Sequence, residues 1–84
     1  MKLTIGTLSL DITSFDWNRD VLSFDCLYLT EDELAYLALL EMRTVTLLNQ
    51  KCLCDTERID MTGYDTQNAR YVANLVLKIH RTYQ

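Results

Sequence analysis

The sequence predicts an α+β fold, in which a small antiparallel sheet in residues 1–29 precedes a three-helix core in residues 30–83. Apolar and polar residues alternate in the first third of the chain, as they do in half-buried strands. At residue 30 the spacing changes to one that is typical of helices. A length of 84 residues fits one domain with a modest core, so residues 1–84 are expected to fold as a single domain.

The predicted sheet has three or four short strands. Leu3 and Ile5 alternate with polar residues, Gly6-Thr7 offers a turn, and a second alternation covers residues 8–12. Residues 13–17 are compatible with a further short strand, and residues 18–20 are a turn cluster. Residues 21–29 predict another strand, whose expected inner face is formed by Phe24, Cys26 and Tyr28.

The first predicted helix begins with a capping box. The Thr30 hydroxyl is expected to accept a hydrogen bond from the amide of Glu33, whose side chain reaches back to the amide of Thr30. The helix is expected to run from Glu31 to about Arg43. It is apolar nearly all round, which predicts a central core helix. The next segment, residues 44–47, fits a loop, a short strand or a frayed helix end.

Two further helices are predicted. Asn49 is a plausible N-cap for a short helix from Gln50 to about residue 58 or 59, and residues 60–65 form a loop. Asp65 or Thr66 then caps a C-terminal helix over residues 67–83. Four residues of this helix recur at i, i+4, i+7 and i+11 and form its apolar face. They are Val72, Val76, Ile79 and Tyr83.

Charge is distributed unevenly along the chain. All twelve acidic residues lie in residues 1–65, together with five cations, whereas residues 66–84 hold three cations and no acid. The face of the C-terminal helix opposite its apolar one is therefore basic and polar. Such a face on an otherwise acidic protein indicates a binding surface for a partner. It consists of Gln67, Arg70, Asn74, Lys78 and Arg81.

Several segments resemble the winged-helix DNA-binding domain of the OmpR/PhoB type. Residues 3–11, LTIGTLSLD, are similar to its opening strands, and residues 29–34, LTEDEL, to its L-T-x-x-E segment. Residues 47–53, LLNQKCL, are similar to the start of its second helix. The segment from Gly63 through Ile79 is similar to its loop and recognition helix. The resemblance implies a helix-turn-helix core. The family's C-terminal hairpin, the wing, has no counterpart before Gln84, so the expected form is wingless.

This resemblance implies a small DNA-binding transcriptional regulator, bacterial or phage-like, that inserts its C-terminal helix in the major groove of double-stranded DNA. Arginine, lysine and asparagine can reach base edges, which suits Arg70, Asn74 and Lys78. Phosphate contacts suit Gln67, Tyr71, Lys78 and Arg81, with Lys51 at the start of the second helix. The same face is also compatible with simple solvation. A homodimer would double the DNA contacts.

The alternative hypothesis is a protein-binding regulatory module or inhibitor that acts on another regulator or enzyme without binding DNA. Trp17, with Phe15 nearby, either packs under the sheet or marks a patch for a protein partner. An exposed acidic or aromatic patch around Trp17 would favour this alternative, and burial of the basic face in a dimer would argue against DNA binding.

Other chemistry is not predicted. Cys26, Cys52, Cys54 and His80 nominally offer four zinc ligands, but the spacing of Cys52 and Cys54 is too short for a usual zinc pair. No motif indicates an enzyme, a cofactor or a metal. Three cysteines without framework spacing fit reduced thiols in a cytoplasmic protein. No apolar run approaches the roughly 20 residues that cross a bilayer, so no membrane association is expected.

Overall fold

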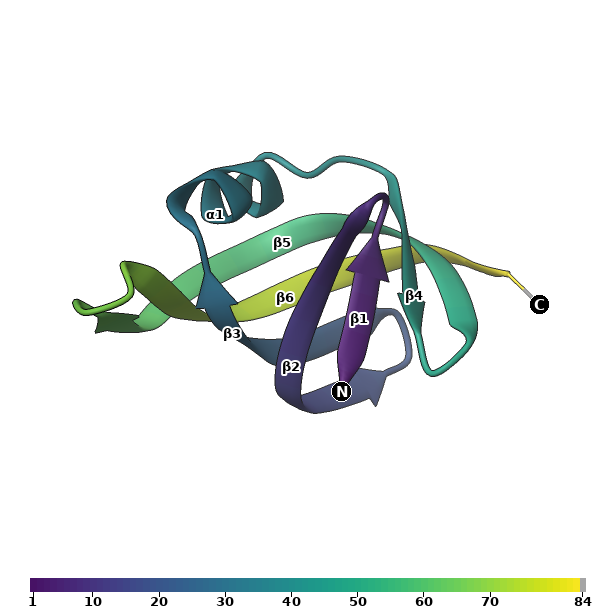
Figure 1. The fold of residues 1–84 in the computed structure, drawn as a ribbon. Helices are drawn as coiled ribbons and strands as arrows, with labels where there is room; N and C mark the ends of the chain where they lie inside the picture. The colour runs from purple at the N-terminus through teal and green to yellow at the C-terminus, as the bar shows by residue number, and fades with distance from the viewer. Residues whose placement is uncertain (84) are drawn as a thin grey trace.

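The computed structural model describes residues 1–83 and shows a closed barrel of six antiparallel strands with one short helix (Figure 1). Around the barrel the strands follow the order β1-β2-β3-β6-β5-β4, and β4 pairs with β1 to close it. The predicted α+β fold with a three-helix core is therefore wrong. The elements are β1 Lys2–Ile5, β2 Leu8–Asn18, β3 Val21–Leu29, α1 Glu31–Ala38, β4 Arg43–Leu47, β5 Gln50–Asp65 and β6 Arg70–Tyr83.

The first three strands confirm the prediction for residues 1–29, and they form a meander. Gly6 opens the turn between β1 and β2 with φ of 59°, a conformation that glycine adopts without strain. A register shift between Ile12 and Phe15 then changes which side chains of β2 face inward. Leu10 and Ile12 are buried before the shift, and Phe15 and Trp17 are half-buried after it. The bulge therefore brings both aromatic rings to the inner side of the barrel.

The predicted inner face of β3 is only partly correct. Phe24 and Cys26 are buried, but Tyr28 has φ of 59° and is 61% exposed. The pairing with β6 shifts register between Cys26 and Leu29, so the chain inverts there and Leu29 takes the inward position. Tyr28 is thus left on the surface.

Helix α1 confirms the capping box but not the central position. The Glu33 amide donates to Thr30 Oγ1 at 3.1 Å, and the Thr30 amide donates to Glu33 Oε1 at 2.9 Å. The helix ends at Ala38, and Leu37 is its one fully buried residue. Leu39, which follows the helix, is 81% exposed. The helix lies beside β5 (Figure 1), so it covers one side of the barrel and contributes only Leu37 to the core.

The predicted second helix is a strand. Residues 43–47 form β4, and the two-residue loop Leu48-Asn49 turns the chain directly into β5. Both loop residues have positive φ, 51° for Leu48 and 66° for Asn49, as the type I′ turn of a hairpin requires. Asn49 is a turn residue and not a helix cap. Residues 60–65, predicted as a loop, complete β5.

The predicted C-terminal helix is also a strand, which removes the last support for the winged-helix resemblance. Ala73, Leu75, Leu77 and Ile79 are buried and alternate with outward residues. Residues four apart share a face in a helix and in a strand alike, so Val72 and Val76 fit both periods. The strand is the form that is adopted because it points every second side chain, Ala73, Leu75, Leu77 and Ile79, into the barrel core.

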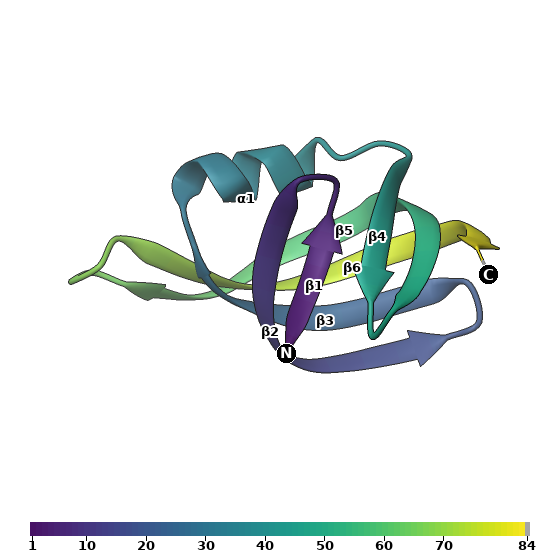
Figure 2. The same cartoon turned by 45° about the vertical axis from the view of Figure 1, so that its right-hand side comes forward.

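The core is made of apolar side chains and thiols from all six strands and α1, and no polar side chain in residues 1–83 is buried. The β5–β6 hairpin is longer than the barrel and projects from one end, beside α1 (Figures 1 and 2). The β2–β3 turn, the β4–β5 turn and the end of β6 gather at the opposite end. No helix within residues 1–83 has the length and apolarity needed to cross a bilayer.

Candidate docking groove

The residues predicted to contact DNA do not form one compact patch. At about 3.3 Å per strand residue, Arg70 and Arg81 are about 36 Å apart along β6. A recognition helix is absent from residues 1–83, so insertion of a C-terminal helix in a major groove has no element to perform it. Binding of nucleic acid by another surface stays a prediction. Gln67 lies in the β5–β6 turn, Lys51 lies near the start of β5, and Arg70, Tyr71, Asn74, Lys78 and Arg81 lie on β6.

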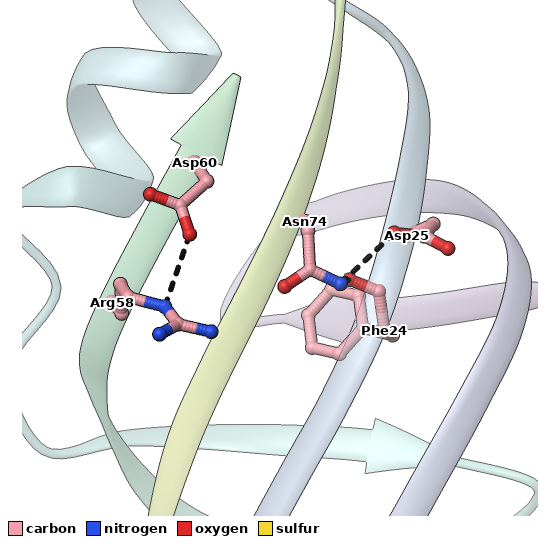
Figure 3. A network of polar contacts seen from close by, with 5 residues as sticks. All are labelled: Phe24, Asp25, Arg58, Asp60 and Asn74. Atoms are coloured by element: carbon pink, nitrogen blue, oxygen red, sulfur yellow. Dashed lines mark hydrogen bonds and ion pairs between the residues drawn. The ribbon is translucent and has the colours of Figure 1, made fainter. Parts of the chain in front are cut away.

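Asn74 lies at the centre of a polar network on the outer face of the sheet (Figure 3). The strand register places it between Asp25 of β3 and Asp60 of β5. Its Nδ2 donates to Asp25 Oδ1 at 2.9 Å, while Asp60 Oδ2 pairs with Arg58 Nε at 3.0 Å. The amide that was expected to read a base is therefore engaged within the protein.

Lys78 lies in a second cluster farther along the same face. The register pairs it with Asp55 of β5, and His80 Nε2 lies 2.7 Å from Asp55 Oδ2. Asp55 Oδ1 also accepts a hydrogen bond from the amide of Met42, in the segment between α1 and β4. This amide, together with His80 and Lys78, holds the pKa of the Asp55 carboxyl below its usual value. The cluster ties the segment before β4 to the barrel wall.

The hairpin tip is held by its own residues. The Tyr64 and Tyr71 rings lie across the strands with centroids 4.6 Å apart. Arg70 Nη1 donates to the carbonyl of Asn68 at 3.1 Å. Asp65 accepts from the Asn68 side chain and the Gln67 amide, and these bonds lower the pKa of its carboxyl. Gln67, Arg70 and Tyr71 thus stabilise the tip.

A groove of about 410 Å³ lies between α1 and β5. The C-terminal end of the helix is fixed to the strand at one point, where the Thr56 hydroxyl donates to the carbonyl of Leu37 at 2.8 Å and the Thr56 amide to that of Leu40 at 3.4 Å. The groove runs from there toward the start of the helix. Its lining consists of Glu31, Leu34, Ala35, Ala38, Ile59, Asp60 and Met61.

Within the described residues, 1–83, the edge of β5 beside this groove has no strand partner. β4 pairs with β5 only over residues 50–54, whereas β5 continues to Asp65. Among residues 1–83, the Thr56 amide makes the last backbone hydrogen bond on that side. A strand edge of this kind presents unpaired amide and carbonyl groups. The groove thus combines an apolar wall with a backbone that can accept another strand.

This site is hard to predict from the sequence, because its residues also fit other predicted elements. Ile59 ended a predicted helix, and Met61 lay in a predicted loop. The alternation of Ile59, Asp60 and Met61 was the available signal for a strand at this position. Its free edge follows from β4 being shorter than β5, which no local pattern reveals.

The nominal zinc ligands are not brought together. Cys26, Cys52 and Cys54 are buried in the barrel, whereas His80 is exposed and bound to Asp55. Cys52 Sγ and Cys54 Sγ are 3.3 Å apart because both side chains point inward from one strand. Burial raises the pKa of all three thiols, that of Cys26 to about 12. The thiols behave as core residues.

Comparison with protein-family models, with curated proteins and with solved structures gives no match to this chain.

Proposed function

We propose that this protein is a protein-binding module, and that it takes up an extended segment of its partner as an added strand beside β5. The observation that supports this function is the unpaired edge of β5 next to the apolar wall of α1. In strand addition the main chain provides affinity and the side-chain pockets provide specificity. Both components are present in this groove.

The available edge is short and well defined. Residues 58–61 of β5 pair with β6 without interruption, between a register shift at Thr56/Arg58 and another at Met61/Gly63. Bulges twist a strand away from further pairing, so an added strand would pair with this run alone. Contacts of this size are typical of weak, reversible complexes.

The lining of the groove defines the segment that fits. Alternate side chains of an added strand point to the same face, so every second residue would meet the wall formed by Leu34, Ala38 and Ile59. Glu31 and Asp60 lie in the lining, Asp32 is exposed next to Glu31 in sequence, and Glu57 is exposed three residues before Asp60. Arg58, which pairs with Asp60, is the cation of this region. A segment that alternates apolar and basic residues therefore fits best.

Fluorescein-labelled nonapeptides that alternate lysine with valine, lysine with serine, or glutamate with valine test this function by anisotropy. We expect measurable binding of the lysine–valine peptide alone. Hydrogen exchange of the complex should show new protection of amides in residues 58–61. Protection elsewhere, or equal binding of the three peptides, would contradict strand addition at β5.

Matched helix variants separate the groove from general surface effects. Ala35→Arg and Ala38→Arg place a long side chain in the groove at exposed positions, and arginine is a good helix former. Each variant is expected to weaken peptide binding at least tenfold. Leu39→Arg changes an exposed residue outside this groove and should leave binding unchanged. Equal loss in all three variants would indicate that charge, and not the groove, controls binding.

A further inference from the structure

A second groove, of about 460 Å³, opens at the other end of the barrel. The bulge in β2 turns Phe15 and Trp17 toward it, the end of β4 supplies Leu47, and the β4–β5 turn supplies Leu48. Gln50 and Thr82 are its two polar lining residues. The Gln50 Nε2 donates to the carbonyl of Tyr83 at 2.8 Å, which leaves Oε1 as a possible acceptor. Aromatic walls with a few polar groups are typical of ligand sites.

Leu48 is placed at the rim of this groove at a cost to the fold. It has φ of 51°, where branched side chains are strained, and it is 65% exposed. Its turn position favours asparagine or glycine, and exposure of the side chain stabilises nothing within the protein. Strain of this kind is found where a residue contacts a ligand.

Cations surround the same end of the barrel. Lys51 pairs in register with Tyr83, Arg81 with Leu53, and Lys78 with Asp55. Arg19 lies in the β2–β3 turn, where the Asp20 carbonyl accepts from the Ile79 amide at 2.6 Å. Four of the eight cations of the chain are therefore near this groove. The acids of the same end are Asp16, Asp20 and Asp55, and Asp55 is occupied by His80 and Met42.

We propose that this groove binds single-stranded nucleic acid, with a base against Trp17 or Phe15 and phosphates at the surrounding cations. Aromatic side chains bind bases by stacking, and a cationic surface follows the backbone. Gln50 and Thr82 can form hydrogen bonds with the edge of the base. Lys78 and Arg81 are three strand residues apart on β6, about 10 Å along the strand, and Arg19 and Lys51 lie on two other segments of the chain. A polymer therefore fits this arrangement better than a mononucleotide, and a duplex keeps its bases stacked away from the groove.

Tryptophan fluorescence provides a direct measurement because Trp17 is the single tryptophan. We expect a twelve-residue oligo(dT) to quench it at low salt, with affinity that falls as salt rises by a slope of about −0.7 per phosphate contacted. Oligo(U) tests the ribose form under the same conditions. A hairpin duplex and thymidine monophosphate should bind at least tenfold more weakly. No quenching by either oligomer at low salt would overturn the proposal, as would equal affinity for the duplex or the mononucleotide.

Charge and rim variants complete the test. Lys51→Gln combined with Arg81→Gln should weaken binding at least tenfold and reduce the salt slope. The matched control, Arg58→Gln with Arg70→Gln, removes the same charge in the middle of β5 and at the far end of the β5–β6 hairpin, and should change affinity less than threefold. Leu48→Gly relieves the turn strain, so it should fold fully, confirmed by circular dichroism, yet bind more weakly. Equal effects of the two double variants would show that net charge, and not this groove, controls binding.

Discussion

His80 Nε2 lies 2.7 Å from Asp55 Oδ2 because β6 has one extra residue at this point. Cys54 pairs with Ile79 and Leu53 with Arg81, so His80 has no partner of its own in β5. Its ring stands on the outer face next to the carboxylate that accepts the Met42 amide. A bulge in one strand is thereby linked to the segment that leads into β4.

This relationship predicts how stability depends on pH. The pKa of Asp55 is lowered in the folded protein, so its contribution is present above the unfolded value of about 4 and is lost as pH falls through the folded value. We expect Asp55→Asn to lower the melting temperature at pH 7, and to lower it less at pH 3. Melting followed by circular dichroism at both pH values tests this. Asp16→Asn, at an exposed position of β2, serves as the control. A deficit that is the same at both pH values would contradict the prediction.

Alternation along β6 predicts which substitutions destabilise the barrel. Leu75 and Leu77 are fully buried, whereas Val76 between them lies on the outer face. Leu75→Ala and Leu77→Ala should each lower the free energy of unfolding by about 2–5 kcal/mol, as cavities in cores do. Val76→Ala should cost about 1 kcal/mol or less. Urea denaturation measures these differences, and a cost for Val76→Ala as large as those for the leucines would exclude this strand arrangement.

The strands and the helix start within residues 1–33 could be predicted from the sequence, but the exposed position of Tyr28 could not, and the elements after Ala38 were predicted wrongly. Strict alternation around Leu3, Ile5 and Leu10 identifies strands, and Thr30 with Glu33 identifies a helix start, because both signals are local. After Ala38, the spacing of apolar residues is compatible both with the period of a helix and with the period of a strand. Val72 and Val76 fit a helix, while Leu75 and Leu77 fit a strand. Closure of the barrel decides between them, since β6 is buried only when β3 and β5 flank it.

The two grooves show a similar limit. Trp17 was expected either to pack under the sheet or to mark an exposed patch, and it lies between these two outcomes, half-buried at a groove. That position depends on the bulge in β2, which cannot be predicted from the residue types at positions 12–15. The basic character of residues 66–84 was visible in the sequence, but its distribution over the outer face of a strand depends on the fold.

Leu48 is strained in the β4–β5 turn, which predicts that a substitution there can stabilise the protein. Leu48→Gly removes a side chain from a left-handed position, where ordinary residues cost about 1–2 kcal/mol. Glycine loses more backbone entropy on folding than leucine does, and this loss offsets part of the relieved strain. We therefore expect a net increase of about 0.5–1 kcal/mol in the free energy of unfolding. Asn49→Ala, at the next residue, should instead destabilise the turn. Urea denaturation of both variants measures the difference, and a less stable Leu48→Gly protein would show that Leu48 is not strained.

Burial of the three thiols predicts slow labelling in the folded protein, and the labelling rate then reports how the barrel opens. Cys26, Cys52 and Cys54 are fully buried and their pKa values are raised, so thiolate is scarce and out of reach of reagent in the folded state. Ellman's reagent should therefore label them slowly in native buffer, at a rate set by opening of the barrel, and should label three thiols rapidly in denaturant. In the Leu77→Ala variant a loss of about 2 kcal/mol should speed native labelling roughly thirtyfold if opening is global. Fast labelling of one thiol in both proteins would instead identify a local opening, and cysteine-to-serine variants would locate the strand that leaves the barrel first.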